Sequence, residues 1–488
     1  MLKDGEKPTA EDKPDEARGA PFAPDAKRKR TDGRMACRST TNGDMTNGDT
    51  TKTMLVFAVP MILGNLLQQC YNIADTLIVG RFLGAGALAA VGSAYTLMVF
   101  LTSILLGLSM GSGAVFSIRF GEKRLDRVRN SVFVSFLLIG IVTVVLTLAA
   151  IFLIDDILRL LHVPDDIYPL MRGYVRIIFH GIVFTFFYNY FACLLRAVGD
   201  SVSPLVFLAV STVVNIVLDI VLIVVYRMEV EGAALATVAA QALAGIGIAV
   251  HALRRYPELR VRKRDMRFSR ATFREIGQSS ILTCIQQSVM NFGILMVQGL
   301  VNSFGTAVMA AFAAAVKIDS FAYMPVQDLG NAFSTFVAQN HGAGRSDRIR
   351  EGIRRIASAT GIFCLTVGIL VVLFARPLTL IFIDSAETEI IATSVQYLRT
   401  VAPFYFGIGI LFLLYGFYRA LLRPGISLLL TIISLGTRVA LAYLLAAIPT
   451  IGVSGIWWAI PIGWILADCT GIGYYAIKRK RLLPEQQK

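Results

Sequence analysis

Charged residues are scarce in this sequence, and cysteine and histidine are scarcer still. Asp, Glu, Lys and Arg make up 16% of the 488 residues, whereas soluble globular proteins average about 25%. The six cysteines stand singly and the four histidines are far apart, so neither a zinc site nor a disulfide framework is expected. P-loop and HExxH motifs are also absent, and we expect neither an enzyme nor a cofactor. The run Gly111-Ser112-Gly113 is typical of a close helix contact.

Long apolar runs fill most of the chain instead. Hydrophobic residues make up 55% of the sequence, and no Asp, Glu, Lys or Arg interrupts residues 82–118, 131–154, 276–316 or 439–467. A helix needs about 20 apolar residues to cross about 30 Å of hydrocarbon, and these runs lack the alternation of barrel strands. The sequence therefore predicts an all-α membrane protein in a lipid bilayer. Its twelve helices are expected near 54–80, 87–118, 131–154, 167–195, 203–226, 231–252, 275–301, 306–340, 355–375, 391–421, 425–448 and 452–477.

Lys and Arg gather in alternate loops, at residues 119–129, 254–274, 345–355 and 478–481. Basic loops remain on the cytoplasmic side, so both termini are predicted to be cytoplasmic. The net charge of +14 is then a consequence of topology, and nucleic-acid binding is not expected. The chain divides into a disordered cytoplasmic tail (1–52), an N-lobe (53–255), a basic cytoplasmic linker (256–274) and a C-lobe (275–482).

The two halves of the chain repeat each other. At an offset of about 221 residues, Gly84 corresponds to Gly305, and the Gly-x-x-Arg-x-Asp-Arg-x-Arg pattern starting at Gly121 recurs at Gly342. At about 223, Arg196 corresponds to Arg419. Six helices per half is an even number, so the two six-helix lobes are expected to be related by a pseudo-two-fold axis along the membrane normal. Two such lobes with a cleft between them are typical of an alternating-access carrier.

Several motifs in this order resemble the multidrug and toxic compound extrusion (MATE) transporters over residues 54–480. They are Ala74-Asp75-Thr76-Leu77-Ile78-Val79-Gly80, Leu195-Arg196-Ala197-Val198-Gly199-Asp200, Asn215-Ile216-Val217-Leu218-Asp219 and Ala338-Gln339-Asn340-His341-Gly342-Ala343-Gly344. The pattern looks more like the branch of the DNA-damage-inducible and archaeal members than the NorM branch. The resemblance implies a monomeric exporter of small amphipathic molecules in a prokaryotic cytoplasmic membrane.

Four polar residues of the N-lobe are candidates for an ion site, because polar groups inside a membrane are costly and usually functional. Counting about 1.5 Å per residue places Asp75, Asp219 and Thr237 at about 8–10 Å from the outer helix ends, and Asn215 lies one turn before Asp219. Such an oxygen-rich cluster can hold Na⁺ or a shared proton, and the resemblance implies this coupling role. A purely structural hydrogen-bond cluster is the alternative.

Further polar residues accompany these four. Pro60 can bend the first helix, although a static kink is an equal alternative, and Gln68, Tyr71 and Asn72 are expected to share the hydrogen-bond network of Asp75. In the C-lobe, Asp319 is predicted to pair with Arg438. Lys317, Arg438 and the helix-borne Gln286 and Gln287 are alternatively a site for anionic or zwitterionic parts of a substrate.

The sequence thus predicts an antiporter that exports amphipathic, often cationic compounds against an inward flow of H⁺ or Na⁺, with the coupling ion at Asp75, Asn215, Asp219 and Thr237. The alternative is a flippase for lipid-linked precursors from the same superfamily. A flippase of this kind needs a strongly basic cavity for a pyrophosphate, and Lys317 and Arg438 are too few to favour it.

Overall fold

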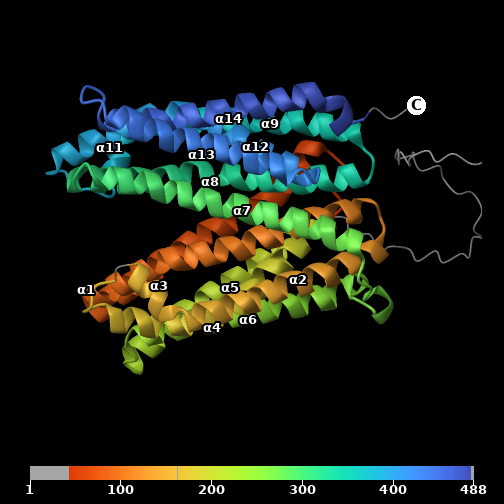
Figure 1. Ribbon diagram of the computed structural model, residues 1–488, viewed down its shortest axis with the longest axis horizontal. Coiled ribbons are helices and arrows are strands. Elements are labelled where there is room, and N and C mark those ends of the chain that lie inside the picture. Colours follow the sequence, from red (N-terminus) through yellow and green to blue (C-terminus); the bar gives the residue numbers. More distant parts are fainter. Residues whose placement is uncertain (1–42, 162, 485–488) are drawn as a thin grey trace, which may run out of the picture. The chain divides into compact units, whose positions relative to one another are not determined.

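The computed structural model describes residues 43–161 and 163–484, and every regular element in these ranges is a helix (Figure 1). Twelve helical segments are long and apolar enough to cross a membrane, which confirms the predicted fold class. The elements are α1 (Thr50–Gly121), α2 (Leu125–Phe152), α3 (Ile154–Leu160), α4 (Tyr168–Ala197), α5 (Val202–Asp219), the π-helix η1 (Ile220–Val225), α6 (Glu229–Arg255), η2 (Pro257–Leu259), η3 (Lys263–Asp265), α7 (Arg270–Asn302), α8 (Thr306–Gly342), α9 (Ser346–Leu373), α10 (Ala375–Leu380), α11 (Thr388–Val401), η4 (Ala402–Phe404), α12 (Tyr405–Ala420), α13 (Pro424–Ala446) and α14 (Val453–Leu482).

α1 contains two spans, Thr50–Gly84 and Gly86–Gly121. The chain reverses between them at Gly84, which has φ 85° and ψ −175°, whereas Gly305, its counterpart in the repeat, has φ 95° just before α8. A positive φ is strained for any residue that carries a Cβ. The repeated glycine is therefore what lets each half of the chain fold its first two helices against each other.

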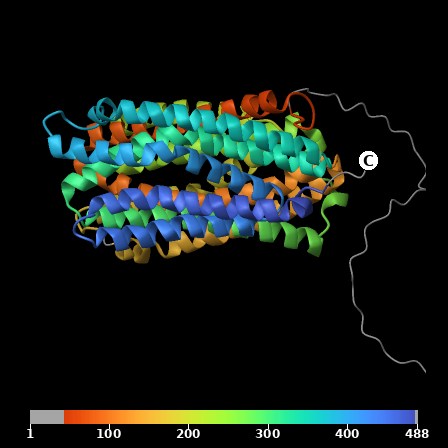
Figure 2. The same ribbon diagram turned by 90° about the horizontal axis from the view of Figure 1, so that it is seen from above.

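The described helices enclose two main apolar cores. The N-lobe core is made by α1, α2, α4 and α6, and the C-lobe core by α8, α9 and α11–α14. Two helices begin in the opposite lobe: Met54 and Phe57 at the start of α1 belong to the C-lobe core, while Ile276 near the start of α7 packs against Val115 and Val134 of the N-lobe. Figures 1 and 2 both show the red start of α1 beside the teal helices of the C-lobe.

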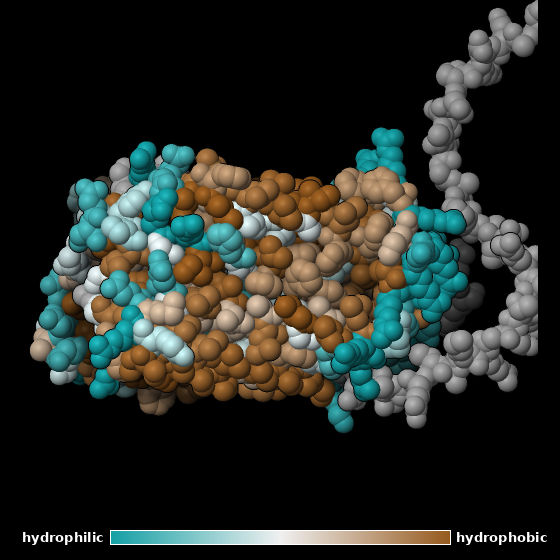
Figure 3. Space-filling model, turned by 90° about the horizontal axis from the view of Figure 1, so that it is seen from below, coloured by the Kyte–Doolittle hydropathy of each residue, from teal (hydrophilic) through white to brown (hydrophobic). Residues whose placement is uncertain are grey.

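On the face drawn in Figure 3, an apolar belt lies between two polar ends. Exposed leucine, isoleucine, valine and phenylalanine side chains occur along most of the spans, for example Leu77, Val213 and Ile362. Apolar side chains favour contact with lipid tails over contact with water. A surface of this kind is expected of a multi-pass membrane protein.

The two lobes meet most closely at the end of the bundle where the first and last described residues lie, which we call the terminal end. A Cβ on Gly121 would lie 2.0 Å from the backbone oxygen of Gln339, and a Cβ on Gly342 would lie 1.9 Å from that of Ile118. These two glycines are repeat counterparts, so α1 and α8 cross here backbone to backbone. This crossing brings the two lobes into direct contact at the terminal end.

The glycines around Ser109 and Ser112 have the same packing role. A Cβ on Gly107 would lie 2.5 Å from Cα of Cys284, and one on Gly111 would lie 2.5 Å from the backbone oxygen of Ser279. The Ser112 and Ser280 hydroxyls are hydrogen-bonded at 2.8 Å. The Gly-Ser-Gly run is thus a helix contact between α1 and α7, as its sequence indicates.

Residues 43–49 precede α1 and lie against the C-lobe at the terminal end. The backbone N–H of Met45 donates to Oε1 of Gln339 at 3.0 Å, and the backbone oxygen of Met45 accepts from Nδ2 of Asn340 at 3.1 Å. Arg345 donates to the backbone oxygen of Thr46. Nη1 of Arg348 donates to that of Gly48 at 2.9 Å. These bonds fasten the segment to the end of α8 and the start of α9.

The same segment also contacts the N-lobe. A Cβ on Gly199, which has φ 88°, would lie 1.9 Å from the backbone oxygen of Gly43. The predicted disordered tail, residues 1–52, is therefore wrong for residues 43–52, where Met45 is 2% exposed and α1 has already begun at Thr50. Side-chain and backbone hydrogen bonds with distant residues fix this polar segment, and its composition alone could not reveal them. The rest of that prediction, residues 1–42, lies outside the described residues.

Gly342→Ala is expected to lower the thermal unfolding temperature in detergent by a few degrees. The added methyl group meets backbone that cannot move aside, and overpacking of this kind costs about 1–3 kcal/mol. Gly361→Ala in α9 is the matched control, because nothing lies within 4 Å of a Cβ there and alanine favours a helix. Equal unfolding temperatures for the two variants would contradict the close crossing of α1 and α8.

Candidate functional site

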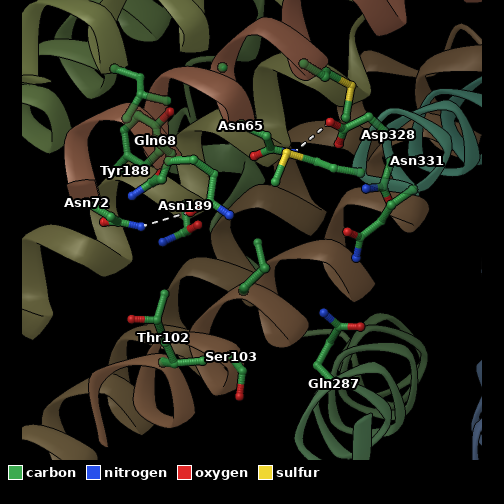
Figure 4. A pocket seen from close by; sticks show the side chains of 18 of the residues that line it. Asn65, Gln68, Asn72, Thr102, Ser103, Tyr188, Asn189, Gln287, Asp328 and Asn331 are labelled. Carbon is green, nitrogen blue, oxygen red and sulfur yellow. Dashed lines mark hydrogen bonds between the residues drawn. The ribbon is translucent and has the colours of Figure 1, made fainter. Parts of the chain in front are cut away.

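A cavity of about 1030 Å³ lies between the lobes and is lined by α1, α4, α5, α6, α7, α8 and α12. Uncharged polar side chains dominate its middle, and Figure 4 shows Asn65, Gln68, Gln287 and Asn331 around the open space. The residues that line it extend from Arg419 near the terminal end to Leu77 near the opposite end of α1. A cavity of this volume is large enough for a drug-sized molecule.

The structure brings the four predicted N-lobe residues together on one side of this cavity. The carboxyl groups of Asp75 and Asp219 lie within hydrogen-bonding reach of each other. The side-chain amide of Asn215 is assigned the orientation in which both its nitrogen and its oxygen have partners. In that orientation the nitrogen donates to Oδ2 of Asp219 at 2.9 Å, and the oxygen accepts from the backbone N–H of Thr237 at 3.2 Å. Asp219 is fully buried and Asp75 is 9% exposed.

The local structure of α5 helps to place Asp219. Asn215 and Asp219 are four residues apart on the last turn of α5, so both side chains project from the same helix face. The helix then widens at once into the π-helix η1. Single turns of π-helix are rare and often accompany functional sites. Thr237 enters from α6, and its hydroxyl is 3.3 Å from the hydroxyl of Tyr71.

No Lys or Arg contributes to the electrostatic surroundings of either Asp75 or Asp219 among the described residues. One oxygen of each carboxyl group, Oδ1 in both cases, is also buried without a hydrogen-bond partner. Two adjacent carboxylates repel each other, and they remain together only when a proton or a cation lies between them. The arrangement can therefore hold H⁺, or Na⁺ with the amide and hydroxyl oxygens nearby as further ligands. No cluster of three or more His, Cys, Asp or Glu side chains occurs in the described ranges.

The supporting residues are placed in part as expected. Pro60 and Gln68 both line the cavity, and Nδ2 of Asn72 donates to Oε1 of Gln69 at 3.3 Å rather than to the carboxylates. Of this group, Tyr71 is hydrogen-bonded to the cluster, through the hydroxyl of Thr237. Pro60 stands inside α1 without any non-helical backbone angle around it, and the one interruption of this helix is at Gly84.

Asp319 and Arg438 do not form the predicted ion pair at salt-bridge distance, although each acts electrostatically on the other. The carboxylate of Asp319 accepts hydrogen bonds from two buried tyrosines instead, at 2.7 Å from Tyr397 and also from Tyr405. No salt bridge within 4 Å joins Asp319 to Arg438, whose buried Nε has no hydrogen-bond partner. Helix spacing placed the two charges at similar depths. It could not show that two tyrosine hydroxyls, from α11 and α12, donate hydrogen bonds to the carboxylate.

The other C-lobe candidates are distributed around the cavity. Lys317, Gln286 and Gln287 all line it, and Oε1 of Gln286 is buried without a partner. Lys317 is exposed, whereas Asp319 is buried and does not line the cavity. Lys317, Gln286 and Gln287 therefore face the cavity, whereas Asp319 belongs to a buried hydrogen-bond network.

Sequence reasoning missed several polar residues. Asn65 donates to Oδ2 of Asp328 at 2.7 Å, a bond that joins α1 to α8 across the cavity (Figure 4). Arg196 and Arg419 line the same cavity, although the sequence had singled them out only as repeat counterparts and, for Arg196, as part of a family motif. Asp468 of α14 is 6% exposed, and its Oδ1 has no partner. A systematic count of polar residues within the spans would have found Asn65 and Asp468.

Asp75→Asn is expected to make the thermal stability of the protein less dependent on pH. As the pH rises, the pair loses its shared proton, and the repulsion between two carboxylates in apolar surroundings destabilises the wild type. A neutral amide beside Asp219 removes that repulsion, so the variant should unfold at the same or a higher temperature at pH 8. The measurement is unfolding temperature in detergent between pH 5 and pH 8.

Asp166→Asn is the control for this experiment, because Asp166 lies exposed in the loop before α4. This control removes the same charge and should keep the pH dependence of the wild type. An Asp75→Asn protein with the unchanged wild-type dependence would show that the two carboxyl groups do not share a proton.

Comparison with known proteins agrees with this geometry. The sequence matches the MatE family over residues 60–221 and 280–444. It is 31% identical over 442 residues to the probable multidrug resistance protein YpnP of Bacillus subtilis, covering 89% of this chain and 97% of that protein. It is 23% identical over 439 residues to the FAD transporter of Shewanella oneidensis, covering 88% of this chain and 94% of that protein.

Solved structures show the same fold. A multidrug resistance MATE family transporter of the MOP superfamily, in an outward-facing conformation, aligns with a TM-score of 0.85 and 24% sequence identity, covering 91% of this chain and 99% of that one. The match to the family model covers both repeats, and the likeness to YpnP covers nearly the whole chain. This chain belongs to the MATE family of multi-pass membrane transporters.

Proposed function

We propose that this protein is an antiporter that exports small amphipathic compounds in exchange for H⁺ or Na⁺. The observation that carries the proposal is the pair of carboxyl groups, Asp75 and Asp219, within reach of each other and without a basic partner. Asp75 also lines the cavity between the lobes. A cation at the pair therefore lies next to the space in which a transported molecule would bind.

The coupling follows from the position of the pair beside the cavity. A cation that binds better in one conformation shifts the protein toward that conformation by no more than its difference in affinity. Binding at Asp75 and Asp219 changes the charge of the cavity wall, and it disfavours a cationic molecule in the cavity at the same moment. Ion and cargo then compete for opposite states of the carrier.

Alternating access is supported by the close contact of the two lobes at the terminal end of the bundle. At the terminal end, α1 and α8 cross backbone to backbone at Gly121 and Gly342, and residues 43–49 lie against both lobes. The cavity lies beyond this contact. We propose that the lobes separate at this crossing when the cavity opens to the cytoplasm, the side on which the positive-inside rule places both termini.

The cavity wall suits flat molecules with apolar surface. Tyr95, Tyr188, Phe412 and Tyr415 line it together with Met290, and such side chains bind aromatic and cationic groups by stacking and cation–π contacts. The relatives named above are described as a multidrug resistance protein and an FAD transporter. We therefore propose a small amphipathic cargo, a monomeric protein without a cofactor, and a place in the cytoplasmic membrane of a prokaryote.

The test is efflux of ethidium from cells that express the protein, under separately imposed proton and sodium gradients. Wild type should export ethidium with one of the two gradients, and Asp75→Asn and Asp219→Asn should each lose at least nine-tenths of that rate. Asp319→Asn is the matched control, since it removes a buried carboxylate outside the pair and should keep gradient-driven efflux.

Efflux that continues unchanged in both Asp75→Asn and Asp219→Asn would contradict the coupling role of the pair. An absence of wild-type efflux with either gradient would contradict drug export. Translocation of a lipid-linked precursor in vesicles would then support the flippase of the same superfamily.

A further inference from the structure

A surface groove of the C-lobe lies between α11 and α14, outside the cavity between the lobes. It has a volume of about 530 Å³, and the residues that line it include Val395, Gln396, Arg399, Phe404 and Trp458. Arg399 is exposed, and of the described residues that line the groove it is the one with a charge. The groove therefore presents a single cation beside apolar and aromatic side chains.

The position of Arg399 along its span places it inside the hydrocarbon region. α11 begins at the end of the bundle opposite the terminal end (Figure 1), and the span Thr388–Ala420 has 33 residues. At about 1.5 Å per residue, this span exceeds the roughly 30 Å of hydrocarbon by about 10 Å at each end. Arg399 lies about 16 Å from the start of α11 by the same rise, so its Cα is roughly 6 Å below the hydrocarbon boundary.

The neighbouring α14 agrees with this depth. Nε2 of Gln396 donates to the hydroxyl of Ser454 at 2.9 Å, and α14 begins at Val453. Arg399 therefore lies nearly one helical turn below the start of α14. Ile448 and Ile451, which precede α14, are 42% and 36% exposed. Apolar surface thus continues outward of Arg399, and this side chain emerges within the apolar belt.

Arg399 has no partner within the described part of the chain. No hydrogen bond, ring contact or salt bridge within 4 Å involves its guanidinium among these residues. Arg399 stands in the last turn of α11, but the chain continues through η4 into α12, so a helix end does not account for it. A lone cation in hydrocarbon is costly, and long arginine side chains extend toward the lipid phosphates instead.

The deeper part of the groove is aromatic. The rings of Phe404 and Trp458 have centroids 5.8 Å apart and lie nearly edge to face, and Phe404 is further from the start of the span than Arg399. Tryptophan is enriched where a membrane meets water. The groove thus has its polar part, with Gln396 and Arg399, outward and its aromatic part inward, which is the order of headgroup and acyl chain in a lipid.

We propose that this groove binds a phospholipid of the outer leaflet, with the lipid phosphate on Arg399 and an acyl chain along Phe404 and Trp458. The positive-inside rule places the terminal end in the cytoplasm, so the groove faces the opposite leaflet. A planar guanidinium binds phosphate oxygens through paired N–H donors. The unbalanced positive charge favours an anionic lipid over a zwitterionic one, because Arg399 repels the ammonium group of the latter.

The test uses Trp458 as the reporter. Of the three tryptophans, Trp457 and Trp464 are 0% and 5% exposed, whereas Trp458 is 47% exposed, so bromine atoms on lipid chains should quench chiefly Trp458. The purified protein is reconstituted into phosphatidylcholine vesicles that contain rising fractions of brominated phosphatidylglycerol or brominated phosphatidylcholine. In wild type, the quenching curves should show about threefold tighter binding of the anionic lipid.

Variants separate the charge of Arg399 from the charge of the surface. Arg399→Gln should remove the preference for the anionic lipid, whereas Arg399→Lys keeps the positive charge and should retain most of it. Arg376→Gln is the matched control, because Arg376 is an exposed arginine of α10 in the same lobe that does not line the groove. This control should keep the wild-type preference. Trp458→Phe should lose most of the lipid-dependent quenching.

Equal quenching by the two brominated lipids in wild type, a result that needs no variant, would overturn the proposal. A preference that survives in Arg399→Gln would also overturn it, and so would one that survives in Trp458→Phe, since the lipid would then lie elsewhere. None of these measurements involves transport, so their failure would leave the proposed antiporter standing.

Discussion

Two carboxyl groups held together in an apolar environment constitute the constraint on which the rest of this account depends. Asp75 and Asp219 come from different helices, α1 and α5, and no basic side chain among the described residues compensates their charge. A buried pair of this kind is stable only with a bound proton or cation. The amide of Asn215 and the hydroxyl of Thr237 then complete a small polar site, and Asp75 and Thr237 also line the cavity between the lobes.

The repeat explains how the chain builds both this cavity and the contact between the lobes at the terminal end. Gly84 and Gly305 reverse the chain at corresponding points, while Gly121 and Gly342 let α1 and α8 cross without a side chain between them. The starts of α1 and α7 each pack in the opposite lobe. Movement of one lobe relative to the other therefore has to act on these two helices, and α1 also carries Asp75.

The two halves are similar in fold but differ in chemistry. The N-lobe has the carboxyl pair, whereas in the C-lobe Asp319 accepts hydrogen bonds from two tyrosine hydroxyls and forms no salt bridge within 4 Å with Arg438. The repeat counterparts Arg196 and Arg419, by contrast, remain alike, and both line the cavity. The two halves thus share their helix geometry and differ in the polar groups at these positions.

The span count, the repeat and the gathering of Asp75, Asn215, Asp219 and Thr237 could be predicted from the sequence, because hydrophobic length fixes the depth of a residue and helix periodicity fixes the face on which it lies. Side-chain partners could not be predicted. Depth alone suggested an ion pair between Asp319 and Arg438. Only the tertiary structure shows that Tyr397 and Tyr405 donate hydrogen bonds to the Asp319 carboxylate. Residues 43–49 looked like a polar tail, yet Gln339, Asn340 and Arg348 bind them through contacts that composition does not reveal.

Infrared difference spectroscopy of the purified protein tests the central claim most directly, by following the carbonyl band of protonated carboxylic acids. The account predicts a wild-type band that disappears when the pH is raised or Na⁺ is added, that is missing in Asp75→Asn and Asp219→Asn, and that persists in Asp319→Asn. A band that responds in the same way in all four proteins would show that the pair does not hold the exchangeable ion.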